Sequence, residues 1–421
     1  MKRGRGRRLR QWVVLVAGVA LLASVTTFKH PTVLNNATPM TAPAIADQAD
    51  NPDDVDEVLF YLLEQLEDGW ADWSTIAGFY DQLDADTVQR LTRDFPAHIA
   101  NLPGAPLEER IAANQVMVQQ AMEDSARWPA PDRPWQEGDR PPRRDLEELA
   151  QEDRQLIGFD VRTNQGHGSW VEIVGELDAS NVVVMVPGGS AYITSENFNR
   201  YYWRAQSFVE ETDDLAIIVW AEPPSPAGWI QESFAAWSQY AAEEVSTFVA
   251  DLRHQMGEDT LMTLAGHSYG GATIGLAEKH PLEVDQVVHI ASPGTGHRVS
   301  GPEDYSDPCR DRFSMTAPGD PISYVQGLGD LPMMGHGAHP DEFPGIVRLE
   351  TGSTPDWDGA VDDIGRDLQE LGISGTVIEG THSHSEVFVP FSDAWDNLLS
   401  VFTGNEFVPH TDQPVSWPDC P

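Results

Sequence analysis

The pattern that most constrains the fold begins at residue 155, where short apolar runs start to alternate with helical segments. QLIGFDV, SWVEIVGEL and NVVVMVPGG are β-branched and end at turn residues, which is typical of strands. LAIIVWAEPP is apolar almost throughout, which is typical of a strand buried on both faces. The other expected strands are TLMTLAG, VDQVVHIASPG, RFSMTAPGD and SGTVIEGTH, and the expected helices are NFNRYYWRAQSFVEE, residues 233–256, YGGATIGLAEKH and DAWDNLLSVF. This alternation predicts an α/β fold, a mostly parallel sheet with helices on both faces.

One expected strand, TLMTLAG, runs directly into the motif Gly266-His267-Ser268-Tyr269-Gly270 and then into an expected helix. A G-x-S-x-G motif at a sharp strand-to-helix turn is a nucleophile elbow, which lifts the serine hydroxyl to the edge of the sheet. Glycines on both sides lack a Cβ, so that neighbouring backbone packs closely around the bend. A bare match in a loop occurs by chance, and the flanking strand and helix are what favour the elbow here.

A serine hydroxyl is a weak nucleophile, so it needs a base and an acid that orients the base. In proteins with this elbow the acid and then the base follow the serine along the chain. Asp320 comes directly after RFSMTAPG, whereas the next aspartate, Asp330, lies further out in a glycine-rich loop. The sequence therefore predicts Asp320 as the acid. His382 and His384 both follow the last expected strand, and spacing alone does not choose between them as the base.

Backbone N–H groups near the serine are expected to stabilise an oxyanion. The N–H of Tyr269, at the start of the expected helix, points at the same place as the serine hydroxyl. A second donor is expected in the loop after NVVVMV, from Gly188, Gly189 or Ser190, although a plain tight turn is the alternative reading of this loop. No cofactor and no metal are expected, because no Cys, Asp or Glu cluster with ligand spacing accompanies the His382-Ser383-His384 segment.

The net charge of the chain argues against a nucleic-acid partner, and the charge of its N-terminus indicates where the protein is located. The chain has 67 acidic and 26 basic residues, a formal net charge of -41, so we expect no nucleic-acid partner. The N-terminus departs from this balance, since MKRGRGRRLR precedes the apolar residues 12–28. This arrangement predicts export, either with a cleaved signal peptide or with an N-terminal membrane anchor, so the bulk of the chain lies outside the cytoplasm. The two cysteines, Cys309 and Cys420, form a disulfide in that compartment or remain unrelated thiols.

The composition divides the chain into six segments. Residues 1–29 are the signal peptide or anchor, and 30–50 are a linker. Residues 51–127 have helical spacing and form an N-terminal helical subdomain, followed by a proline-rich connector at 128–154. The α/β domain covers 155–405, and 406–421 are a C-terminal tail.

Several blocks, in order, resemble a family of bacterial α/β hydrolases that is frequent in actinobacteria and has no assigned function. The blocks are FPAHIANLPGAPLEERIAAN, VVVMVPGGSAYITSENF, AIIVWAEPPSP, LAGHSYGGATIG, VVHIASPGTG, TAPGDPIS, GAHPDEFPG and HSEVFVPFSDAWDNL. The resemblance covers about residues 55–405 and implies the alpha/beta-hydrolase fold and its catalytic layout. The family's closing motif is a histidine and serine followed thirteen residues later by Asn-Leu. That register falls on His384 and Asn397-Leu398, so the resemblance favours His384 over His382 as the base.

These expectations together describe an exported serine hydrolase that cleaves an ester or related acyl bond of a small-molecule or lipid-like substrate. Ser268, His384 and Asp320 form the expected triad. Two alternatives stay open: a cell-envelope acyltransferase with the same triad, and a non-catalytic binding protein on a hydrolase scaffold. Membrane association is expected through the N-terminal segment only.

Overall fold

The computed structural model describes residues 52–125, 143–151, 154–222, 225–226, 228–327, 334–355 and 375–410. The expected export segment and the linker lie outside these ranges, as do most of the connector and the end of the C-terminal tail. Two compact units are separated between Asp72 and Trp73, within the expected helical segment 51–127. In the first unit the structure describes the helix α3 (Pro52–Glu67). Within the described ranges, no helix has the length and apolarity needed to cross a bilayer.

The second unit is built around a sheet of eight strands. Their order across the sheet is β1-β2-β4-β3-β5-β6-β7-β8. β1 pairs with β2 and β2 with β4 in antiparallel fashion, and the pairs from β4 through to β8 are parallel. The strands are β1 (Gln155–Asp160), β2 (Ser169–Val174), β3 (Asn181–Val186), β4 (Leu215–Ala221), β5 (Leu261–His267), β6 (Gln286–Ile290), β7 (Asp311–Met315) and β8 (Ile346–Arg348). The mostly parallel sheet predicted from the sequence is thereby confirmed.

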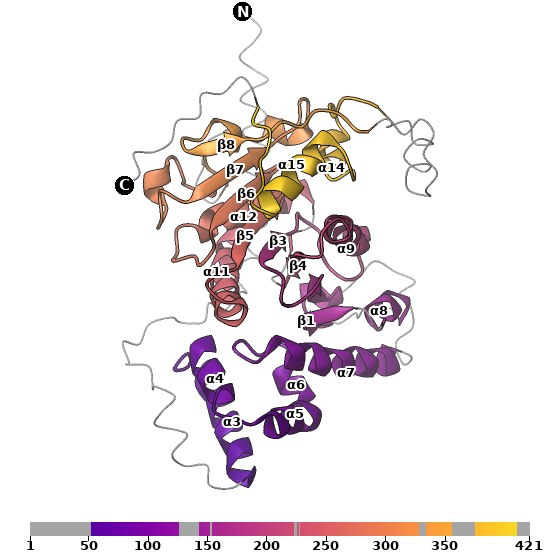
Figure 1. Cartoon of the computed structure of the whole chain (residues 1–421), viewed down its shortest axis with the longest axis vertical. Helices are drawn as coiled ribbons and strands as arrows, with labels where there is room; N and C mark the ends of the chain where they lie inside the picture. Colours follow the sequence, from indigo (N-terminus) through magenta and orange to yellow (C-terminus); the bar gives the residue numbers. More distant parts are fainter. Residues whose placement is uncertain are drawn as a thin grey trace, which may run out of the picture. The chain divides into compact units, whose positions relative to one another are not determined.

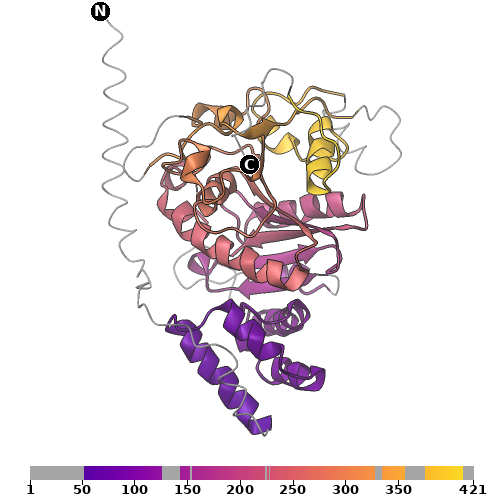
Figure 2. The same cartoon turned by 60° about the vertical axis from the view of Figure 1, so that its left-hand side comes forward.

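Helices cover both faces of this sheet, as Figure 1 and Figure 2 show. Successive strand residues point to opposite faces, so Val183 and Met185 of β3 enter one core and Val182 and Val184 the other. The first core also contains side chains of α9 (Glu196–Val209) and α15 (Asp393–Phe402), and the second those of α11 (Ala236–Met256) and α12 (Tyr269–Ala277). All seven residues of β4 are buried, because this strand is covered on both sides. The remaining helices of this unit are α4 (Trp73–Tyr80), α5 (Ala85–Asp94), α6 (Pro96–Ile99), α7 (Leu107–Ser125), α8 (Arg143–Leu149), α10 (Trp229–Glu232) and α14 (Ser383–Glu386).

Two buried side chains of α7, Arg110 and Asn114, attach this helix to its neighbours. Arg110 is buried and donates through Nε to the carbonyl of Ile157 in β1 at 2.9 Å. Its Nη1 lies 3.4 Å from Asp251 Oδ2 on α11. Asn114 donates to the carbonyl of Ala100 at 2.6 Å, which holds the turn before α7. Arg110 and Asn114 therefore act in packing, and helices α4 to α7 belong to the same unit as the sheet.

The end of the sheet differs from the prediction at one strand. The segment 374–382 was expected to be the last strand, but within its described part only Val377 forms a bridge, to Ser353. Gly375 and Gly380 have φ of 60° and 85°, and such left-handed residues interrupt an extended ladder. The edge position next to β7 is taken instead by β8, which was not predicted.

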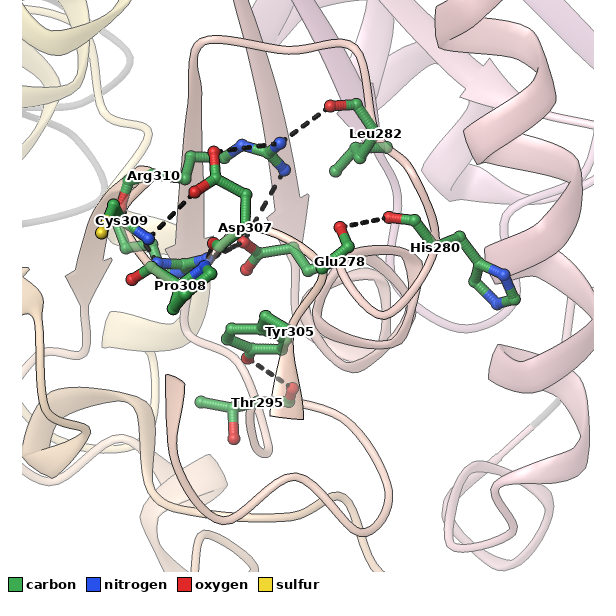
Figure 3. Close-up of polar contacts among 11 residues, drawn as sticks. Glu278, His280, Leu282, Thr295, Tyr305, Asp307, Pro308, Cys309 and Arg310 are labelled. Carbon is green, nitrogen blue, oxygen red and sulfur yellow. Dashed lines mark hydrogen bonds and ion pairs between the residues drawn. The ribbon is translucent and has the colours of Figure 1, made fainter. Parts of the chain in front are cut away.

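A buried cluster of charged side chains lies at the C-terminal end of α12 (Figure 3). Glu278, just after α12, lies 2.7 Å from Arg312 Nη2 and 3.9 Å from Arg310 Nη1. Arg310 also donates to the carbonyl of Leu282 at 2.8 Å. Cys309, in the turn before these arginines, is disulfide-bonded, and Cys420 lies outside the described residues. The cluster connects the start of β7 to the end of α12, the helix that follows Ser268.

Candidate active site

Ser268 stands between the last residue of β5 and the first residue of α12, as the motif predicts. Its backbone has φ 53° and ψ -126°, a strained conformation for a residue with a Cβ. The flanking glycines are required by close backbone contacts. A Cβ on Gly266 would lie 2.5 Å from the Gly270 carbonyl oxygen, and one on Gly270 would lie 2.2 Å from the Val186 oxygen. The turn therefore has the geometry of a nucleophile elbow.

The predicted acid and one of the two predicted bases lie together at the same edge of the sheet. Asp320 follows β7 and is completely buried. His384 lies on α14, and its Nδ1 is 3.0 Å from both Oδ1 and Oδ2 of Asp320. The His384 side chain is 28% exposed, so this histidine is partly open to solvent. His382 is exposed, and within the described part of the chain no contact joins it to Asp320.

Ser268 and His384 are held near one another through the residue between Gly266 and Ser268. The ring of His267 lies 5.0 Å from the ring of His384, and its Nε2 is 3.0 Å from the His384 carbonyl oxygen. Among the described residues, no hydrogen bond joins Ser268 Oγ to His384 itself. Contacts of this kind are often long without a bound substrate and shorten when one binds.

A buried chain of hydrogen bonds connects the loop after β3 with the helix α14, which carries His384. Gly188 donates its N–H to the Tyr201 hydroxyl at 2.8 Å, and that hydroxyl lies 2.7 Å from His267 Nδ1. A carbonyl oxygen only accepts, so His267 Nε2 carries the proton and Nδ1 accepts from Tyr201. Burial, followed by the charge of Arg204, holds the pKa of His267 well below its usual range. The neutral imidazole of His267 therefore connects the loop after β3 to α14 through hydrogen bonds.

The three residues predicted as second oxyanion donors have different surroundings. The N–H of Gly188 is used by Tyr201, and the N–H of Ser190 donates to the Pro226 carbonyl at 2.8 Å. The N–H of Gly189 has no hydrogen-bond partner among the described residues, and neither has that of Tyr269. Gly188 packs against the nucleophile, because a Cβ there would lie 2.9 Å from Ser268 Cβ. Of the four predicted donors, Gly189 and Tyr269 thus have an N–H that is available to an oxyanion.

An apolar pocket opens beside this loop, with an empty volume of about 350 Å³ out to its open mouth. Its walls are the loop after β3, the end of β4 at Trp220 and Ala221, and the first turns of α11 and α12. Gly188 and Tyr269 belong to the lining. The pocket therefore adjoins Tyr269, one of these donors, and can receive an apolar part of a ligand.

Two contributors to the site were missed by the sequence reasoning. Tyr201 lies in the middle of α9, 66 residues before its partner His267, and no local pattern marks such a pair. Glu232, at the end of α10, reaches the Gly189 backbone. A carboxylate in a short polar stretch gives no signal of its own, so neither residue could have been found without the fold.

Comparison with known proteins agrees with this geometry at the level of the family. Residues 164–330 match the family model described as "Alpha/beta hydrolase". No curated protein matches the chain significantly.

Among solved structures, the esterase domain of a Rhodothermus marinus protein aligns at 14% identity over 52% of this chain and 95% of its own, with a TM-score of 0.28. Esterase PE8 aligns at 16% identity over 47% and 97%, with a TM-score of 0.29. A dienelactone hydrolase from Anabaena variabilis aligns at 16% identity over 41% and 79%, with a TM-score of 0.29. These scores are low, so the fold assignment rests on the sheet order and on the family match.

Proposed function

We propose that the protein is an exported serine hydrolase that cleaves an ester or related acyl bond, a proposal supported by the match of residues 164–330 to the alpha/beta hydrolase family model. The observation that carries the proposal is the buried Asp320 carboxylate, with both oxygens 3.0 Å from His384 Nδ1, at the edge of the sheet where Ser268 follows β5. A strained serine, an acid and a base in this chain order form the arrangement that activates a serine hydroxyl.

In the proposed reaction Ser268 Oγ attacks the acyl carbon while His384 Nε2 takes its proton. Asp320 holds the proton on Nδ1 and stabilises the imidazolium. The carbonyl oxygen becomes an oxyanion that accepts from the N–H groups of Gly189 and Tyr269. His384 then gives its proton to the leaving alcohol, and an acyl-enzyme remains on Ser268. A water molecule deprotonated by His384 attacks this ester, the acid is released, and the proton returns to Ser268.

The proposed substrate is a small-molecule or lipid-like acyl compound, with its apolar part in the pocket between the loop after β3 and α11. Export is supported by the basic and then apolar N-terminal sequence and by the disulfide at Cys309, since disulfides persist in oxidising compartments. We place the catalytic unit outside the cytoplasm, secreted or held at the membrane by the N-terminal segment.

Turnover of nitrophenyl esters of short and medium chain length by the purified protein tests this function. Wild type is expected to release nitrophenol and carboxylic acid in equal amounts, and Ser268→Ala to release neither above background. Addition of a primary alcohol separates hydrolysis from transfer, because an acyltransferase gives mainly the new ester. If folded wild type and Ser268→Ala are equally inactive on every ester, the hydrolase proposal fails and the binding-protein alternative takes its place.

A further inference from the structure

Glu232 brings a carboxylate to the loop that holds the proposed oxyanion donors. It is the last residue of α10, which lies between β4 and α11 along the chain. A Cβ built on Gly189 would lie 2.1 Å from Glu232 Oε1 and 2.7 Å from its Cδ. The carboxylate therefore packs directly on the backbone of Gly189, whose N–H is one of the two available donors. The proposed hydrolysis has no use for a negative charge at this position.

The surroundings of Glu232 leave this charge only partly compensated. Burial raises the pKa of Glu232, while the nearby His384 and a hydrogen bond from the Gly228 backbone act in the opposite direction. Within the described part of the chain, no arginine or lysine forms an ion pair with it. The contact with the Gly189 backbone places the carboxylate beside the proposed donors, and the effect of His384 on its pKa agrees with this position. It therefore belongs to the site and not to the outer surface.

A carboxylate at this position changes the energy of the reaction according to the charge of the substrate. With a neutral ester, it opposes the negative charge that develops on the oxygen bound by the Gly189 N–H. With a substrate that carries a cation, the same carboxylate forms an ion pair, and the opposition to the oxyanion is reduced. We propose that Glu232 is a specificity-determining residue that selects acyl substrates with a cationic amine close to the scissile bond. This inference rests on the proposed hydrolase function.

The overall charge of the chain acts in the same direction. A protein with a formal net charge of -41 raises the local concentration of cations and increases their association rates. Long-range attraction brings cationic compounds to the molecule, and Glu232 is the group that would bind them beside Ser268.

The test uses two pairs of substrates that are matched in shape and differ in charge. Acetylcholine against 3,3-dimethylbutyl acetate places the cation on the alcohol side, and alanine methyl ester against methyl 2-methylpropanoate places it on the acyl side. Acid release is followed at constant pH for wild type, Glu232→Gln and the control Glu244→Gln, which removes an exposed carboxylate on α11. Labelling of each protein with a fluorophosphonate reports whether the serine is reactive.

We expect wild type to prefer the cationic member of at least one pair in kcat/KM. Glu232→Gln is expected to reduce that preference about tenfold, which corresponds to about 1.4 kcal/mol, and to raise the activity on the neutral member. The pair that responds identifies the side of the scissile bond on which the cation lies. Glu244→Gln is expected to behave like wild type.

The inference is overturned if wild type and Glu232→Gln are labelled equally but show the same ratio for both pairs, or if wild type prefers the neutral members. Absence of labelling in folded wild type is a different result. It removes the proposed hydrolase function, and this inference falls with it.

Discussion

Replacement of Asp320 by asparagine tests how the base is held in this site. The Asp320 carboxylate is completely buried, accepts the N–H of Ile322 through Oδ1 at 2.8 Å, and has both oxygens 3.0 Å from His384 Nδ1. In Asp320→Asn the amide oxygen stays on the Ile322 N–H, since only an acceptor fits there. The amide NH₂ then lies 3.0 Å from His384 Nδ1, in the place of Oδ2. The amide oxygen is still 3.0 Å from Nδ1, but the NH₂ repels a proton there, which favours the tautomer protonated at Nε2, the nitrogen that must accept the serine proton.

The loss expected from this change is large. A base in the wrong tautomer, without a carboxylate to stabilise its charged form, lowers kcat about 10³- to 10⁴-fold in a serine triad, or about 4–5.5 kcal/mol. The assay is kcat for a nitrophenyl ester, normalised to the concentration of folded protein. KM is expected to change little, because Asp320 does not touch the substrate.

Asp341→Asn is the matched control, since Asp341 is also buried and is 3.3 Å from Arg348 Nε. It removes a buried carboxylate without touching His384, and its kcat is expected to stay within a few-fold of wild type. A loss of less than tenfold in folded Asp320→Asn, or an equal loss in Asp341→Asn, would refute the role given to Asp320.

Three further predictions concern the supports of the site and the stability of the fold. Tyr201→Phe removes the hydroxyl that joins the Gly188 N–H to His267. We expect the free energy of unfolding in urea to fall by about 1–3 kcal/mol and kcat to fall as well. The control Tyr202→Phe leaves this hydroxyl in place, so its kcat is expected to equal that of wild type. Burial, and then the charge of Arg312, lowers the pKa of His289 to about 3, so its contribution to stability is present above pH 6.5 and is lost as the pH falls, by about 2 kcal/mol at pH 5. The stability difference between wild type and His289→Gln is expected to change by this amount between pH 8 and pH 5, and parallel pH curves would contradict it. Glu278→Ala leaves Arg312 buried without its carboxylate and is expected to lower the free energy of unfolding by about 3–5 kcal/mol (Figure 3). Glu278→Leu combined with Arg312→Leu is expected to recover much of this loss. A loss below about 1 kcal/mol in Glu278→Ala would be evidence against the buried pair.

The sequence pattern was sufficient to predict elements whose residue types are set by their own burial or backbone conformation. Strands such as β4 are apolar over their whole length because both faces are covered, and the glycines around Ser268 are required by the bend itself. These features are visible in the sequence. The resemblance to a hydrolase family was needed to favour His384 over His382, because two histidines two residues apart give the same spacing signal.

Long-range contacts decided what the sequence could not show. The segment 374–382 has β-branched residues but two glycines with positive φ, and an edge position next to β7 was open to β8 instead. Tyr201, His267 and the His384 carbonyl meet across separations of 66 and 117 residues. Glu232 acquires its position only because α10 lies against the Gly189 loop. Contacts between residues so far apart in the sequence can be identified only in the folded structure.

The most direct test of the central claim is mass spectrometry of the purified catalytic unit after reaction with a fluorophosphonate. The account predicts one covalent adduct, on the peptide that contains Ser268, and its loss in Ser268→Ala and in His384→Ala. An adduct on another serine, or no adduct on folded wild type, would contradict it.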